Sequence, residues 1–289
     1  MFVDRIDAER KRFGERWETQ RIFLDRDPFV RSAYQAALRM AETARPPETS
    51  EEIDAWYVNL SFLAHIELHG LCVPTSTAIA NFPEPTYEDR MAMTEHVAVE
   101  SGHLRFWRYM AEKLTGRDPV DEFTPRVLKG AEQFHKFLAR DWLSYLVGLH
   151  ICGEAYGMPV FEGLMTWKVC PPEMVRFTIE DWLPGEFQHQ FTFTDILRRM
   201  LDDAPDDDAR LELAAKIEEL ELEGLYYSGQ LGKWGDALRA VGVSWEGIGD
   251  RYTELRRHVY EDRLGVAAPE KPLPEEVLPG NRGMAPVPV

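Results

Sequence analysis

The sequence repeats one pattern in two halves: a lone glutamate and, some thirty residues later, a Glu-x-x-His pair. Glu67 stands 33 residues before Glu100, and Glu154 stands 32 residues before Glu186. An i, i+3 spacing places the Glu and the His of each pair on one face of a helix. Together the halves offer four carboxylates and two imidazoles, the ligand inventory of a dinuclear iron or manganese site in a four-helix bundle. The candidate metal ligands are Glu67, Glu100, His103, Glu154, Glu186 and His189.

A third Glu-x-x-His match, Glu132 with His135, shows how little the motif means when it stands alone. Lys129 and Lys136 flank it, and the glutamate 32 residues before it, Glu100, is not a lone glutamate but already part of another pair. We interpret it as a solvated helix face. The six candidate ligands instead lie in segments rich in apolar and aromatic residues, where an unpaired charge is costly to bury. One such glutamate could be an ordinary buried acid, but four in mirrored spacing favour a metal site.

Hairpin geometry brings each lone glutamate level with its own pair, because residues equidistant from the turn of an antiparallel helix pair lie side by side. The midpoint between positions 154 and 186 is residue 170, at the break Cys170-Pro171-Pro172. The midpoint between positions 67 and 100 falls between 83 and 84, within the proline-containing stretch 74–85. Two helical hairpins are therefore predicted.

The chain is predicted to be all-α, because helix formers dominate and strand-like alternation is scarce. Residues 1–265 are expected to form one domain, and residues 266–289, which carry six prolines, a tail that is either disordered or draped on a partner. Thr49-x-x-Glu52 and Thr86-x-x-Asp89 are capping-box signatures. The predicted helices cover residues 4–22, 28–44, 50–70, 87–116, a crossover at 125–141, the Glu154 helix to about 168, 172–202, 207–241 and 245–263.

Helix-disrupting residues stand close to two of the candidate ligands. Pro184-Gly185 directly precedes the last candidate glutamate, and such a pair costs several kcal/mol in a helix interior. It predicts a kink or break, which either has no role or re-aims a ligand. Gly148, Gly153 and Gly157 cluster around the second lone glutamate. They either allow close helix packing or leave room beside the metals.

The net charge of −17 disfavours binding to nucleic acid or to an anionic membrane. The acidic stretch 202–208 is interpreted as a solvated turn and helix N-terminus. Cys72, Cys152 and Cys170 show no metal-type spacing and cannot all pair, so reduced thiols in a cytoplasmic protein are expected. Charged residues occur from the fourth position of the sequence onward, and no apolar stretch approaches membrane-spanning length.

These motifs resemble those of the ferritin-like diiron-carboxylate superfamily, in particular its bacterial oxygenase and monooxygenase branch. The resemblance covers residues 50–202 and implies a ferritin-like four-helix bundle with a crossover helix and additional flanking helices. It implies no catalytic residue beyond the metal ligands. In this pattern Glu100 and Glu186 bridge the metals, one iron being bound by Glu67, Glu100 and His103 and the other by Glu154, Glu186 and His189.

The chain departs from the family pattern at three positions. Many members carry Asp directly before the Glu of each pair, where it accepts a hydrogen bond from a ligand histidine. Val99 and Gly185 stand there in this sequence, so another group must orient His103 and His189. The ribonucleotide reductase subunit keeps a radical tyrosine one turn after the first histidine. Trp107 occupies that position here, which disfavours a radical generator.

Four further histidines lie near the candidate ligands. His96 and His150 each precede a candidate glutamate by four residues and share its helix face. A lone extra histidine is more often a neighbour of the site or a core residue than a ligand. In the arylamine oxygenase branch an extra histidine ligand precedes the second pair, but Trp182 stands at that position. His65 and His69 stand two residues either side of the first lone glutamate and are expected to face elsewhere.

The function that the sequence favours is a diiron oxygenase, with O2 as co-substrate and an apolar or aromatic small molecule as substrate. It would hydroxylate, epoxidise or N-oxygenate that molecule. No dinucleotide-binding fingerprint or cysteine cluster could supply electrons, so a separate reductase or ferredoxin is implied. A ferritin-type ferroxidase is the alternative, disfavoured by the extra helices, and a tRNA hydroxylase is disfavoured by the net charge of −17. A homodimer is left open.

Overall fold

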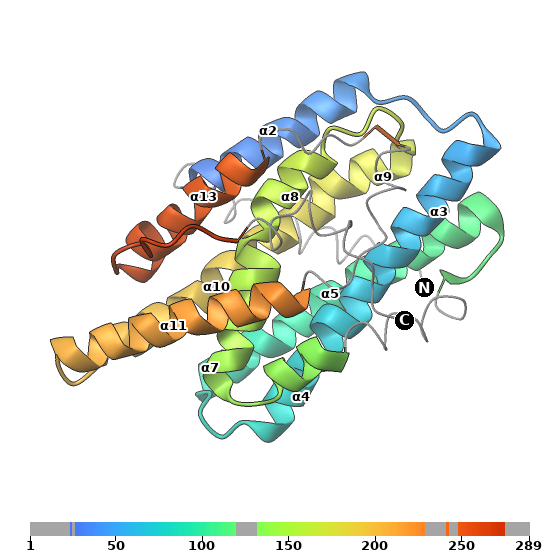
Figure 1. Cartoon of the computed structure of the whole chain (residues 1–289). Coiled ribbons are helices and arrows are strands. Elements are labelled where there is room, and N and C mark those ends of the chain that lie inside the picture. The colour runs from blue at the N-terminus through green and yellow to red at the C-terminus, as the bar shows by residue number, and fades with distance from the viewer. Residues whose placement is uncertain (1–23, 25–26, 120–131, 229–240, 243–247, 275–289) are drawn as a thin grey trace.

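The computed structural model describes residue 24 and residues 27–119, 132–228, 241–242 and 248–274 (Figure 1). The predicted helix 4–22 lies outside the described residues. Within them, the regular structure is helical apart from one isolated bridge between Arg45 and Val169. The prediction of an all-α chain is confirmed, and the helices form a bundle.

The first hairpin pairs a long helical run with one antiparallel helix. The run comprises α3 (Ser50–His65), the π-helical segment η1 (Ile66–Cys72) and α4 (Val73–Asn81), and its partner is α5 (Tyr87–Thr115). Both predicted capping boxes, at Thr49 and Thr86, are present. The predicted end near Gly70 is wrong. A π-type bond from Val73 N–H to Leu68 O widens the helix just ahead of Pro74, so the run accommodates this proline and continues.

The second hairpin follows the same plan. Its first run comprises α7 (Trp142–Tyr145), η2 (Leu146–Ala155) and α8 (Gly157–Leu164), and its second comprises α9 (Pro172–Phe177), η3 (Thr178–Trp182) and α10 (Leu183–Asp202). The turn at 165–171 contains the predicted break. The helix ends at Leu164 instead of about 168, because residues 168–170 bridge to Arg45: Arg45 N–H donates to Lys168 O at 3.0 Å and Cys170 N–H donates to Arg45 O at 2.8 Å.

Pro184 and Gly185 do not break the helix, so the predicted disruption takes another form. The backbone widens into η3 just before them, where Leu183 N–H donates to Thr178 O five residues back. Pro184 then falls in the first turn of α10, where its missing N–H costs little. The distortion therefore lies one turn ahead of the candidate ligands on α10.

Additional helices cover the second hairpin, as predicted. These are α2 (Pro28–Thr43), α11 (Asp207–Ser228) and α13 (Ile248–His258), which continues into η5 (Val259–Leu264). Asp27 caps α2. Figure 1 shows α2 beside α13, and both pack on α8, whereas α11 runs along η2. His258 Nε2 donates to Asp27 Oδ2 at 2.8 Å, joining α13 to the start of α2.

A buried ion pair anchors these helices. Glu221 of α11 is fully buried and accepts from Arg256 Nη2 at 2.6 Å and from Tyr260 Oη at 3.1 Å. A buried carboxylate needs such partners to offset its desolvation. The predicted tail begins along the same surface: Leu273 is buried and Arg256 also donates to Lys271 O. Residues 275–289 lie outside the described residues.

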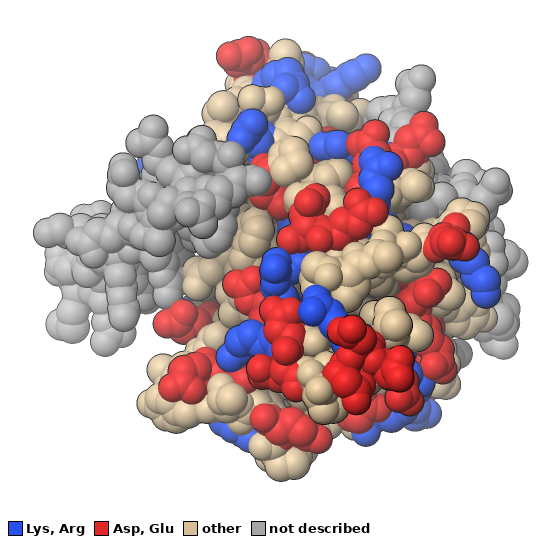
Figure 2. All heavy atoms as spheres, turned by 90° about the vertical axis from the view of Figure 1, so that its left-hand side faces the viewer, with Lys and Arg blue, Asp and Glu red and all other residues tan. Residues whose placement is uncertain are grey.

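The exposed surface is acidic. Figure 2 shows Asp and Glu side chains gathered on the face that forms the left-hand side of Figure 1. Residues 202–208 form the predicted exposed turn and the first turn of α11. The three cysteines are buried and form no disulfide. Among the described residues, none of the helices has both the length and the apolar character needed to cross a membrane.

The predicted crossover at 125–141 lies partly outside the described residues. Residues 132–138 are helical and pack against η2 at Gly148. A Cβ atom at Gly148 would lie 2.7 Å from Leu138 Cδ2 and would also overlap the Phe137 ring. Gly148 therefore serves close packing, one of the two roles that the sequence left open.

We expect Gly148→Ala to lower the free energy of unfolding by about 1–3 kcal/mol, because overpacking forces neighbouring side chains to shift. Gly153→Ala in the same segment is the control, since the nearest atom to its Cβ would be 3.8 Å away. It should leave stability unchanged or raise it by about 0.5–1 kcal/mol. Chemical denaturation measures both, and equal stability of the two variants would contradict the packing assigned to Gly148.

Candidate metal centre

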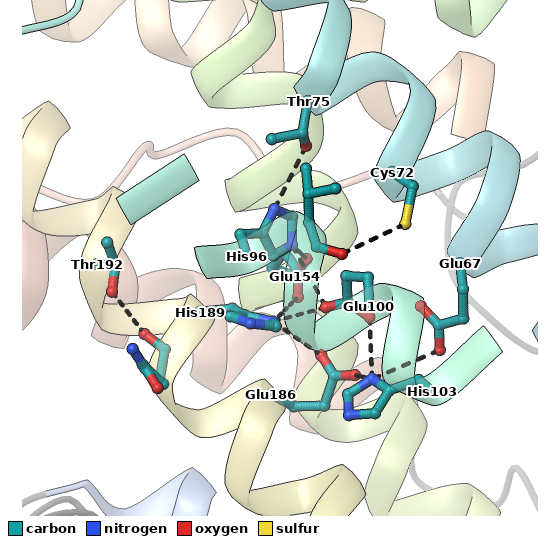
Figure 3. A network of polar contacts seen from close by, with 12 residues as sticks. Glu67, Cys72, Thr75, His96, Glu100, His103, Glu154, Glu186, His189 and Thr192 are labelled. Atoms are coloured by element: carbon teal, nitrogen blue, oxygen red, sulfur yellow. Dashed lines mark hydrogen bonds and ion pairs between the residues drawn. The ribbon is translucent and has the colours of Figure 1, made fainter. Parts of the chain in front are cut away.

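The six predicted ligands meet in the interior between the two hairpins (Figure 3). Each is at most 4 % exposed. They come from four separate helical runs: Glu67 from η1, Glu100 and His103 from α5, Glu154 from η2, and Glu186 and His189 from α10.

The donor atoms form two groups that share one carboxylate. The first group is Glu67, Glu100, His103 and Glu186, and the second is His96, Glu100, Glu154 and His189. Within each group the donor atoms lie within 4.8 Å of one another. Glu100 thus stands where a bridging ligand would stand. Glu186 falls in the first group only, with its Oε2 3.8 Å from His189 Nδ1, so its bridging role stays a prediction.

In the first group three carboxylates converge on one imidazole nitrogen. His103 Nδ1 lies 2.9 Å from Glu100 Oε2, 3.5 Å from Glu186 Oε1 and 3.9 Å from Glu67 Oε1. Trp107, one turn further along α5, donates from Nε1 to Glu67 Oε1 at 3.0 Å. Trp107, which stands where the reductase pattern would have its tyrosine, is thus a positioning residue for a candidate ligand.

The second group contains a histidine that the sequence had not counted as a ligand. His96 Nε2 lies 2.9 Å from Glu154 Oε1 and 3.4 Å from Glu100 Oε1. His189 Nδ1 lies 2.7 Å from Glu100 Oε1, yet neither of these two atoms forms a hydrogen bond of regular geometry. The sequence signal for His96 was its position one turn before Glu100 on the same helix face.

Burial and mutual repulsion decide which carboxyls ionise without a cation. Burial, reinforced by the charge of Glu100, raises the pKa of Glu67 and of Glu186 well above the usual value. Burial also opposes ionisation of Glu100, but the charges of His103 and His189 outweigh it and hold the pKa of Glu100 well below its usual range. Without a cation, ionisation of Glu67 and Glu186 is therefore disfavoured relative to ionisation of Glu100.

The residues fit a pair of divalent ions. Four ionised carboxylates carry four negative charges, which two divalent cations balance. Glu67 Oε2, Glu100 Oε1 and both ring nitrogens of His189 are buried without a hydrogen bond, as expected for atoms that would bind a metal instead. Carboxylate oxygen together with imidazole nitrogen suits iron and manganese.

Packing takes the place of the aspartates that the family pattern would supply. A Cβ atom at Gly185 would lie 2.9 Å from Val99 Cγ1 and 3.1 Å from His103 Nε2. The missing side chain thus lets the His103 ring pack against the backbone of α10. Nε2 of His189 has no hydrogen-bond partner among the described residues.

Three of the four ligand-bearing runs widen into π-helix next to a candidate ligand, a feature common at functional sites. Glu67 lies in η1, Glu154 in η2, and Glu186 four residues after η3. In η1 the His69 carbonyl accepts from His135 Nε2. The interpretation of His135 as solvated is therefore wrong, because the side chain is half-buried against this carbonyl.

The third motif match and the other histidines named from sequence belong to neither donor group. Glu132 is exposed and pairs with Lys136 at 2.6 Å, as interpreted from sequence. His65 and His69 belong to neither group and stack on each other with ring centroids 5.6 Å apart. His150 is fully buried and stacks on Phe193 at 3.4 Å. It is a core neighbour of the site.

Comparisons with protein-family models, curated proteins and solved structures found no match to this chain. The ferritin-like resemblance therefore rests on the ligand motifs.

We expect Glu100→Gln to lose both metals, because Glu100 belongs to both donor groups. The wild-type chain should bind about two ions, and Glu67→Gln, which alters one group only, about one. Glu132→Gln is the matched control and should retain the wild-type content. Elemental analysis after gel filtration measures this, and equal retention by the Glu100 and Glu67 variants would contradict a shared ligand.

The metal-free protein should lose stability as pH rises above the ordinary pKa of a glutamic acid. Glu67 and Glu186 have higher pKa values in the folded state than in the unfolded state. Their contribution to the free energy of unfolding is therefore fully present below the unfolded-state pKa and is lost as pH rises through the folded-state pKa. The lowered pKa of Glu100 acts below this window. Melting temperatures should show a shallower decline in Glu67→Gln and in the metal-loaded protein, and parallel profiles would disprove the assignment.

Proposed function

We propose that the chain is a non-heme dinuclear-iron oxygenase that uses O2 to oxidise an apolar or aromatic small molecule. The observation that carries the proposal is the pair of buried donor groups that share Glu100. Such a centre on antiparallel helices is also what supports a ferritin-like bundle as the fold. Manganese would satisfy the same donors.

The protein's own part is to hold two cations in a dry interior. When bound, two iron ions would supply the redox chemistry of O2 activation. The four carboxylates balance the charge of the ions, and Trp107 fixes Glu67 through its 3.0 Å hydrogen bond. The surrounding side chains exclude water, which strengthens each of these electrostatic contacts.

An aromatic wall beside the first group supports an apolar or aromatic substrate. Trp107 and Trp182 meet edge to face with ring centroids 4.9 Å apart, and Phe177 lies 5.0 Å from Trp107 and 5.8 Å from the His103 ring. Phe161 meets Trp182 at 4.9 Å. Nε1 of Trp182 is buried without a hydrogen-bond partner among the described residues. Such an orphan donor costs about 1–3 kcal/mol, which favours an acceptor atom on the substrate.

The proposal includes a separate electron donor, a reductase or a ferredoxin. The sequence has no dinucleotide-binding fingerprint and its three cysteines form no cluster. A donor with a basic face would be attracted by the acidic surface of the chain.

The test is a single turnover of the diferrous protein with isotopically labelled oxygen. We expect oxygen consumption to depend on an apolar or aromatic substrate, and mass spectrometry to find the label in the product. Glu100→Gln, which should hold no metal pair, is the inactive control. Fast oxidation without any substrate, with a ferric mineral as the product, would instead establish a ferritin-type ferroxidase.

A further inference from the structure

His96 occupies a place in the centre that the repeated motif does not require. It lies one turn before Glu100 on α5 and is 1 % exposed. Figure 3 shows its ring between Thr75 and Glu154, beside His189. The rings of His96 and His189 meet edge to face at 4.3 Å. Two imidazoles thus border the same pair of carboxylates, Glu100 and Glu154.

The far side of the His96 ring has a hydrogen-bond partner that allows Nε2 to face the carboxylates as an acceptor. His96 Nδ1 lies 3.3 Å from Thr75 Oγ1, and Thr75 Oγ1 accepts from Tyr145 Oη at 3.0 Å. A hydroxyl oxygen has two acceptor lone pairs, so Thr75 can also accept from Nδ1–H. The lone pair of Nε2 then points at Glu154 and Glu100. This is the arrangement of a metal-binding histidine whose other nitrogen is held by a hydrogen bond.

The alternative tautomer carries its proton on Nε2. It gives a hydrogen bond to only one of the two carboxylates that face His96. It would serve Glu154 Oε1 at 2.9 Å but leave Glu100 Oε1, 3.4 Å away, without a hydrogen bond. A cation among the four donor atoms would contact all of them, because they lie within 4.8 Å of one another.

We propose that His96 is a seventh metal ligand. It makes the second group an imidazole-rich site, which binds a late first-row divalent ion such as copper or zinc more tightly than the first group does. The second group then offers two imidazoles and two carboxylates, whereas the first offers one imidazole and three carboxylates. Imidazole favours copper, zinc and iron, and carboxylate favours manganese and magnesium. The two metal positions are therefore unequal in preference. This inference rests on the dimetal centre of the proposed function.

The test counts imidazoles directly. Metal-free full-length protein receives about half an equivalent of Cu²⁺, which binds nitrogen-rich sites most tightly, and pulsed electron paramagnetic resonance detects the remote nitrogen of each bound imidazole. We expect two imidazoles in the wild type and one in His96→Gln. His150→Gln is the matched control: it is equally buried and also precedes a ligand glutamate by four residues, but it belongs to neither group. It should keep two.

A wild-type count of one imidazole overturns the proposal whether or not a variant folds, and so does an unchanged count in His96→Gln. Thr75→Val provides a second measurement, because it leaves His96 in place and removes the hydroxyl that would accept from Nδ1–H, together with the acceptor of Tyr145 Oη. It should keep two imidazoles while Cu²⁺ affinity falls about 10–100-fold, and unchanged affinity would overturn the assigned role of Thr75. If the wild type binds two iron ions but its Cu²⁺ has a single imidazole ligand, only the role of His96 is refuted. If the protein binds neither iron nor copper, the proposed function is refuted as well.

Discussion

The fold depends on four carboxylates that share one dry interior. Two like charges about 4 Å apart repel by about 4 kcal/mol even at an effective dielectric constant of about 20, and each buried ion also loses several kcal/mol of hydration. Burial and the charge of Glu100 raise the pKa values of Glu67 and Glu186, so ionisation of both without a cation is unfavourable. The helices can pack around this cluster only if protons or metals neutralise it, so metal binding and folding stability are linked.

Three of the four helical runs that carry these carboxylates widen locally into π-helix. η1 and η2 each contain a lone glutamate, and η3 precedes the pair on α10. A π-turn frees carbonyls from the regular ladder, and in η1 the His69 carbonyl finds His135. The widened turn of η1 is therefore held by a contact from outside the ligand set. The buried pair of Glu221 and Arg256 similarly fixes the flanking helices that cover η2 and α8.

Motif spacing predicted which residues would meet, but not every contact they make. The i, i+3 pairs and the two turn midpoints depend on helix geometry alone, so the convergence of the six candidate ligands and both hairpins could be foreseen. The continuation of the first run past Gly70 could not, because a π-turn changes the hydrogen-bond register around a proline. The place of His96 depends on Thr75 and Glu154, which come from two other helices. Gly185 likewise matters for the His103 ring that packs against it, not for its own helix.

The two halves repeat the ligand spacing, but the residues one turn outside each Glu-x-x-His pair differ in chemistry. One turn outside the first pair stand His96 and Trp107, whose ring nitrogens contact Glu154 at 2.9 Å and Glu67 at 3.0 Å. The equivalent positions around the second pair are Trp182 and Phe193, which contact other rings instead. Helix α5 thus contacts both lone glutamates, whereas the equivalent positions on η3 and α10 are apolar. Because polar positioning groups lie on one side of the cluster and aromatic rings on the other, the asymmetry matches the apolar or aromatic substrate of the proposed function.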